Sequence, residues 1–149
     1  MYKMFKPFIG LKEGCSRLLA LTQVDVERAE KRLGTSFSPQ LRTFYLEIGY
    51  GCWRKGIDDT DETYNSNFFN DPNTIADIVL DKSHHRRPPD GFRSGEIPFF
   101  EVNLHDFLTM KPQGKDPNIV FDGGKPMCDF ETFVSKLYRH AHFWSVDEK

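Results

Sequence analysis

The sequence predicts an α+β fold, an antiparallel sheet with helices packed mainly on one side, in a single domain over residues 1–149. Three observations support this prediction. The 149 residues, 38% hydrophobic and 28% charged, suit one globular domain with a single core. Helical patterns come first, then a block of adjacent strand patterns, then a last helix. The regular strand–helix alternation of a doubly wound parallel sheet is not seen.

Two short amphipathic helices are predicted between residues 26 and 48. Apolar residues recur at helical spacing over Val26–Leu33, and Gly34 ends this helix because glycine readily takes the left-handed conformation. Ser38–Pro39 is typical of a helix start, with a capping hydroxyl before a proline at the first position. Gly49 and Gly51 mark the exit. The apolar face of this second helix consists of Leu41, Phe44, Tyr45 and Ile48.

The flanking segments are less regular. Residues 1–23 suggest a short strand or an extended arm around Tyr2, Met4 and Phe8–Ile9, and either Thr22 or Asp25 could cap the helix that follows. Three leucines are expected to face the core: Leu18, Leu19 and Leu21. Asp71–Pro72 predicts a further helix start, with the helix running to about Lys82.

Strand patterns begin at Ile97. The predicted strands are Ile97–Val102, His105–Met110, Pro117–Asp122 and Lys125–Cys128, with turns near Asn103 and at Gly123–Gly124. Asp129 is expected to cap the last helix, and the tail beyond Trp144 is expected to fray. The apolar face of this helix consists of Phe130, Phe133, Val134, Leu137, Tyr138 and Ala141. Fourteen phenylalanines predict a Phe-rich core, in which Trp53 is also expected.

Composition narrows the class of protein. A net charge of −2 argues against a general nucleic-acid binder, which needs a basic excess to displace counterions. The three cysteines form no CxxC pair, which argues against a zinc ribbon and favours a reduced, cytoplasmic protein. No signal peptide or membrane-spanning stretch is evident, so no membrane partner is expected. The basic run His84–Arg87 suggests a small anion site or, as the simpler reading, an exposed loop.

The residues that could support catalysis do not converge in the sequence. His105 and Asp106 are adjacent in a predicted strand, so their side chains should point to opposite faces. His140 and His142 are two residues apart on a predicted helix and cannot hold one metal ion. Cys128 precedes Asp129, which opposes a thiolate, so it is interpreted as a small buried apolar residue. We therefore predict no enzyme activity, no metal and no cofactor; a metal-dependent hydrolase using scattered His and Cys is the alternative.

The stretch between Trp53 and Pro72 has no helical or strand period and contains an acidic cluster. It could be a solvated loop, a calcium site or an acidic partner-binding surface; calcium is disfavoured because the EF-hand spacing is missing. An aromatic residue and an arginine among charges are common at binding hot spots. The candidate partner-binding residues are Arg54, Asp58, Asp59, Asp61, Glu62 and Tyr64.

Several motifs in order resemble the SUKH superfamily. They are Leu33–Gly34 after an acidic helix, Pro39 followed by Phe44–Leu46, Ile97–Val102, Asp106–Thr109, Pro117–Phe121 and Phe130–Phe133. The chain departs from that pattern at Gly49–Gly51, where relatives usually have an Asn-Gly type turn, and in its long stretch after Trp53.

This superfamily contains a fungal cell-wall-synthesis regulator and bacterial immunity proteins that neutralise toxins. The resemblance implies the same α+β architecture and a structural role for Asp106, such as accepting from turn N–H groups. It also implies a non-enzymatic monomer that binds a cognate protein toxin, for example a nuclease whose basic cleft attracts the acidic loop. A regulatory scaffold that binds a cellular protein is the alternative within the same fold.

Overall fold

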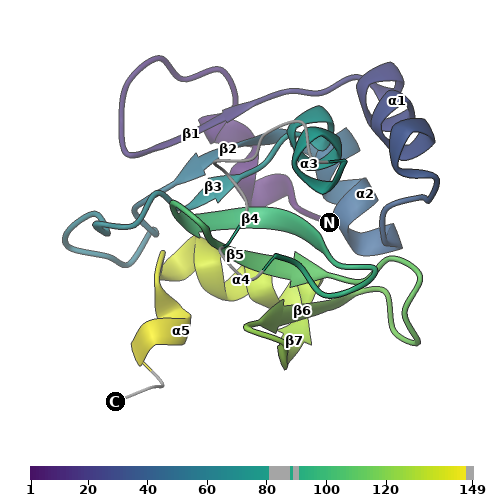
Figure 1. Cartoon of the computed structure of the whole chain (residues 1–149). Helices are drawn as coiled ribbons and strands as arrows, with labels where there is room; N and C mark the ends of the chain where they lie inside the picture. The colour runs from purple at the N-terminus through teal and green to yellow at the C-terminus, as the bar shows by residue number, and fades with distance from the viewer. Residues whose placement is uncertain (81–87, 89–90, 147–149) are drawn as a thin grey trace.

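A computed structural model describes residues 1–80, 88 and 91–146 of the chain, and side chains as far as Trp144. Its centre is one seven-stranded antiparallel sheet in which every strand lies beside its neighbours in sequence, in the order β1 to β7 (Figure 1). The strands are β1 Ser16–Leu19, β2 Tyr50–Trp53, β3 Phe68–Phe69, β4 Ile97–Asn103, β5 Asp106–Met110, β6 Ile119–Asp122 and β7 Lys125–Asp129. The predicted α+β class is confirmed.

The helices begin at the capping residues that the sequence marks. Thr22 and Asp25, which are both candidate caps, act together in a capping box at the start of α1. Ser38, Asp71 and Asp129 accept from backbone N–H groups at the starts of α2, α3 and α4. The helices are η1 Lys3–Phe8 (a 3₁₀ helix), α1 Gln23–Leu33, α2 Pro39–Glu47, α3 Pro72–Val79, α4 Phe130–Arg139 and α5 Phe143–Val146.

Aromatic rings fill the space between the helices and the sheet. Tyr2, which precedes η1, lies 5.4 Å from Phe44 of α2 and 6.1 Å from Phe130 of α4, measured between ring centroids. Phe99 of β4 contacts Phe130 at 5.6 Å, which joins α4 to the strands that lie in front of it in Figure 1. Trp53 is fully buried, and its indole N–H donates to the carbonyl of Leu137 at 2.9 Å. The predicted Phe-rich core and the buried Trp53 are confirmed.

Other predictions were wrong in detail at the N-terminus. Residues 3–8 form a 3₁₀ helix rather than a strand, and only Ile9 makes a bridge, to Leu18. Leu19 is 52% exposed because side chains alternate along β1 and Leu18 takes the core position. Strands β2 and β3 were not predicted; β2 was read only as a glycine-rich helix exit. A Cβ on Gly49 would lie 1.9 Å from the carbonyl oxygen of Leu19, so this close approach requires glycine.

The structure of the second half of the chain agrees more closely with the sequence prediction. Strands β4 to β7 lie where they were predicted, but β5 begins at Asp106 because His105 belongs to the turn, with φ +65°. Helix α3 ends at Val79, three residues before the predicted end at Lys82, which is outside the described residues. The basic run 84–87 is also outside the described residues.

Candidate partner-binding loop

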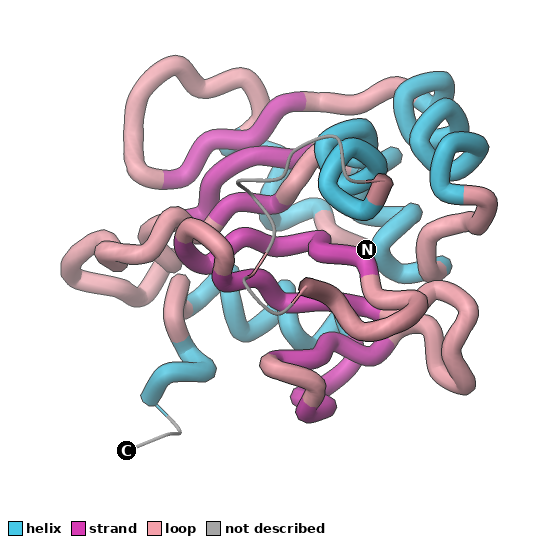
Figure 2. The backbone as a smooth tube through the Cα atoms, in the orientation of Figure 1, coloured by secondary structure: helices cyan, strands magenta, loops and turns pink. Residues whose placement is uncertain are grey.

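Residues 54–67, here called the acidic loop, connect β2 to β3 and project from the end of these strands, at the left of Figure 2. Backbone hydrogen bonds close the base of the loop, from Trp53 N to Asn67 O at 2.8 Å and from Thr63 N to Arg54 O at 2.8 Å. The loop is therefore the long tip of a hairpin within the sheet, and its base is fixed by the strands that carry it.

The acidic loop also docks onto the end of α4. The N–H groups of Ile57 and Asp58 donate to the carbonyls of Tyr138 and Arg139, at 2.8 and 3.0 Å. These carbonyls lie in the last turn of α4, where no further helical residues supply donors, so the loop satisfies them. Gly56 permits the contact, since a Cβ there would lie 2.3 Å from the carbonyl oxygen of Arg139.

Asp59 stabilises the contact between the acidic loop and the end of α4. Its carboxylate accepts from the N–H groups of Gly56 and Ala141, at 2.7 and 2.8 Å, and lies 3.1 Å from Nδ1 of His140. Partial burial alone would raise the pKa of Asp59, but these hydrogen bonds outweigh burial and hold the pKa below its usual value. Asp58 adds a 2.7 Å ion pair with Arg139. Two of the predicted binding residues therefore hold the loop in place.

A second group of contacts holds the other side of the loop. Glu62 pairs with Arg54 at 3.0 Å, and its second oxygen lies 2.6 Å from Sγ of Cys15. The hydrogen bond to the carboxylate raises the pKa of the Cys15 thiol. Arg54 also donates to the carbonyl of Asn65 at 3.3 Å. Glu62 and Arg54 thus brace the loop but remain partly exposed, so they can still contact a partner.

Asp61 and Tyr64 are the members of the predicted set that the fold leaves exposed at the surface. Both are exposed, Tyr64 completely, and the Asp61 carboxylate has no hydrogen bond or ion pair within the described part of the chain. They line a surface cavity of about 410 Å³, formed by residues 59–65 of the loop together with His142. The sequence alone grouped these two with the anchoring residues, because it does not show which carboxylates are already bonded.

The turn between β4 and β5 extends this surface. Asn103 donates to the side-chain oxygen of Asn65 at 3.1 Å, which brings the turn beside the acidic loop. Leu104 follows in the turn and is 67% exposed. The sequence analysis missed Leu104, although an apolar residue in a polar hairpin turn is a signal that could have identified it.

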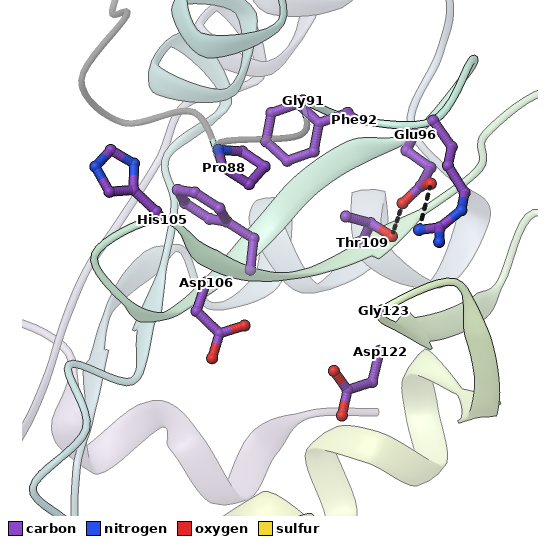
Figure 3. Close-up of a pocket in the computed structure, with 11 residues that line it drawn as sticks. Pro88, Gly91, Phe92, Glu96, His105, Asp106, Thr109, Asp122 and Gly123 are labelled. Carbon is purple, nitrogen blue, oxygen red and sulfur yellow. Dashed lines mark hydrogen bonds and ion pairs between the residues drawn. The ribbon is translucent and has the colours of Figure 1, made fainter.

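The residues that were weighed for catalysis do not assemble into a site. Figure 3 shows the ring of His105 pointing away from the carboxylate of Asp106. No hydrogen bond to the Asp106 carboxylate is found within the described residues, so its suggested role in the turn is not supported. Burial raises the pKa of the Cys128 thiol, which opposes formation of a nucleophilic thiolate. The described residues contain no group of three His, Cys, Asp or Glu side chains placed to hold a metal ion.

One further property concerns membranes. Within residues 1–80, 88 and 91–146, no helix has both the length and the apolar character needed to cross a bilayer.

The sequential antiparallel sheet and the capped helices define a single α+β domain. A sequence model of the SMI1 / KNR4 family (SUKH-1) matches residues 20–145, and the chain belongs to this family. The chain is also similar to a protein of Bacillus subtilis (strain 168) named "Immunity protein YxxD". The two are 26% identical over 106 residues, which cover 68% of each chain. No solved structure matches the chain.

Proposed function

We propose that this protein is a non-catalytic immunity protein that binds a bacterial toxin through the acidic loop and blocks it. Membership of the SUKH-1 family and the similarity to a protein named as an immunity protein support this proposal. The choice of the acidic loop as the binding surface rests on one observation about its structure. It is anchored to α4 at Asp58 and Asp59, yet it presents Asp61 and Tyr64 to solvent.

An anchored loop is well suited to tight binding. A partner that binds a flexible loop must first order it, at a cost of about 1–2 kcal/mol per residue. Here the backbone bonds from Ile57 and Asp58 to α4 fix the loop before a partner arrives. Tyr64 offers a large amphipathic ring, the kind of side chain that dominates interface energies. The docked geometry therefore preserves binding energy that a mobile loop would lose.

The charge of the loop indicates the kind of toxin surface it fits. Asp61 and the partly exposed Glu62 lie on one cavity, which presents negative charge to a partner. A complementary toxin has a basic surface, such as the nucleic-acid cleft of a nuclease, and occlusion of that cleft blocks the substrate. Long-range attraction between the two surfaces should speed association at low salt.

The decisive experiment combines capture with neutralisation. The immobilised protein is exposed to lysate and secreted fractions of the organism that makes it, and the retained partner is tested for toxicity with and without an equimolar amount of this protein. Abolished toxicity supports the proposal. A dominant housekeeping partner without toxicity would instead indicate the regulatory scaffold.

Loop variants then test the surface. Asp61→Asn with Tyr64→Ala removes a charge and a ring that anchor nothing in the described part of the fold. We expect this double variant to weaken toxin binding by roughly tenfold or more. Glu27→Gln neutralises an exposed residue of α1, which lies at the upper right of Figure 1, across the molecule from the acidic loop. This matched control should leave the affinity unchanged. Unchanged affinity in the double variant would place the interface elsewhere.

A further inference from the structure

The acidic loop shares its end of the sheet with the turn between β4 and β5. Because the strands are antiparallel and follow one another in order, the β2–β3 and β4–β5 connections lie at the same end. Asn103 donates to the side-chain oxygen of Asn65 at 3.1 Å. The N–H groups of Ser66 and Asn67 donate to the carbonyl of Val102, at 2.7 and 3.4 Å. These bonds hold the two tips in a fixed relation to one another.

Leu104 lies at the tip of the β4–β5 turn and is 67% exposed. Asn103 pairs with Asp106 across the hairpin, so Leu104 and His105 form a two-residue tip. His105 takes the left-handed conformation, φ +65°, which glycine or asparagine commonly adopts at such tips. A polar residue at position 104 would suit the turn equally well, so the fold itself does not require an exposed leucine there.

A second exposed apolar side chain lies beside Leu104. Tyr64 is completely exposed and precedes Asn65, just as Leu104 follows Asn103, and the side chains of these two asparagines are bonded to one another. Consecutive Cα atoms are about 3.8 Å apart, so Tyr64 and Leu104 fall within the footprint of one standard interface, about 800 Å² per partner. A single exposed leucine is ordinary on a protein surface, but neighbouring exposed apolar side chains with a polar border are typical of protein interfaces.

We propose that Leu104 is an apolar anchor that inserts into a hollow on the partner protein, beside the basic surface that meets the acidic loop. The identification of this partner as a toxin rests on the proposed immunity function, but the chemistry of the surface does not. Asp61 and Glu62 make the neighbouring loop acidic. A partner that covers both tips therefore presents an apolar hollow bordered by basic side chains. The same carboxylates repel nucleic acids and anionic membranes.

A photo-crosslinker at the tip tests this surface without a purified toxin. The photoreactive residue p-benzoylphenylalanine replaces Leu104 in the full-length protein, or Leu19 in the matched control. Leu19 is also an exposed leucine, 52% exposed, but it pairs with Tyr50 at the opposite end of β2 from the acidic loop. Both proteins are irradiated in lysate and secreted fractions of the organism that makes this protein, and linked proteins are identified by mass spectrometry. We expect one dominant adduct at position 104, which excess unmodified protein prevents, and no such adduct at position 19.

Binding kinetics with the linked protein then measure what the leucine contributes. Leu104→Ser should weaken binding by about tenfold, because an apolar side chain is no longer removed from water. The loss should appear in the dissociation rate and be independent of salt, whereas Asp61→Asn should slow association most at low salt. Leu104→Met keeps the apolar surface and should bind within about threefold of the unmodified protein. Leu19→Ser should have no effect, and an unchanged urea midpoint should show that Leu104→Ser is folded.

Three outcomes would overturn the proposal: no adduct specific to position 104, unchanged affinity of Leu104→Ser, or equal losses in Leu104→Ser and Leu104→Met. The acidic-loop proposal would remain standing if the toxin still lost affinity for Asp61→Asn with Tyr64→Ala. Conversely, if the protein linked at position 104 required Leu104 for binding but had no toxicity, the anchor would be retained and the immunity function refuted.

Discussion

Replacement of Asp59 by alanine should destabilise the protein, although the residue lies in a surface loop. The substitution removes the acceptor of the N–H groups of Gly56 and Ala141 and the partner of His140. Each partly buried donor left without an acceptor costs about 1–3 kcal/mol. Because water can reach this surface region, we take the lower part of the range and expect a total loss of about 2–3 kcal/mol in the free energy of unfolding.

Urea denaturation followed by tryptophan fluorescence measures this loss. With a urea dependence of about 2 kcal/mol/M, the midpoint should fall by about 1–1.5 M. Asp61→Ala is the matched control, since Asp61 is in the same loop and its carboxylate has no partner within the described residues. This control should change the stability by less than about 0.5 kcal/mol.

Hydrogen exchange gives a second, local measurement of the same prediction. The amides of Ile57 and Asp58 donate to α4, so Asp59→Ala should reduce their protection selectively. If Asp59→Ala and Asp61→Ala changed the stability equally, or if protection at these two amides were unaffected, the inference that Asp59 anchors the loop would be refuted.

Three further predictions test the docking of the acidic loop onto α4, the packing of the core around Trp53, and the loss of stability at low pH. Gly56→Ala should destabilise by more than about 1 kcal/mol in urea denaturation, because the new Cβ would meet the carbonyl of Arg139 at 2.3 Å. Trp53→Phe should cost about 1–3 kcal/mol in urea denaturation followed by circular dichroism, since the carbonyl of Leu137 loses its indole donor and the core loses volume. Hydrogen bonds with Thr132 lower the pKa of Asp129, so its stabilisation is complete above the unfolded pKa of about 3.9 and is lost as pH falls through the lower, folded pKa. Thermal melting from pH 7 to pH 2 should therefore show little change down to about pH 4 and a decline below it.

The sequence predicts the elements whose signals are local. The helix starts at Ser38, Asp71 and Asp129 were placed correctly because a cap bonds to an N–H three residues along the chain. Strands β4 to β7 were found because each hairpin joins neighbouring segments. Strands β2 and β3 were missed because they are four and two residues long and are separated by the acidic loop. Their pairing depends on contacts that no local pattern records.

The sequence could not show, for a similar reason, which residues of the acidic loop anchor it and which are left exposed. The composition of the loop predicts its charge correctly, but not which carboxylates are bonded inside the fold. Asp58 and Arg139 are 81 positions apart in the chain, and nothing near either residue indicates their contact.

The separation of anchors from exposed residues explains how such a loop can change its partner without loss of the fold. Asp59 accepts from the backbone N–H groups of Gly56 in the loop and of Ala141 just after α4, so most substitutions there would release the loop. Asp61 and Tyr64 make no described contact that the fold needs, so substitutions at these positions change the charge and shape that a partner meets at little cost in stability. A binding surface built in this way can vary while its position stays fixed. Under the proposed immunity function, a protein that must match one toxin among many needs both properties, because specificity is a difference between affinities for competing partners.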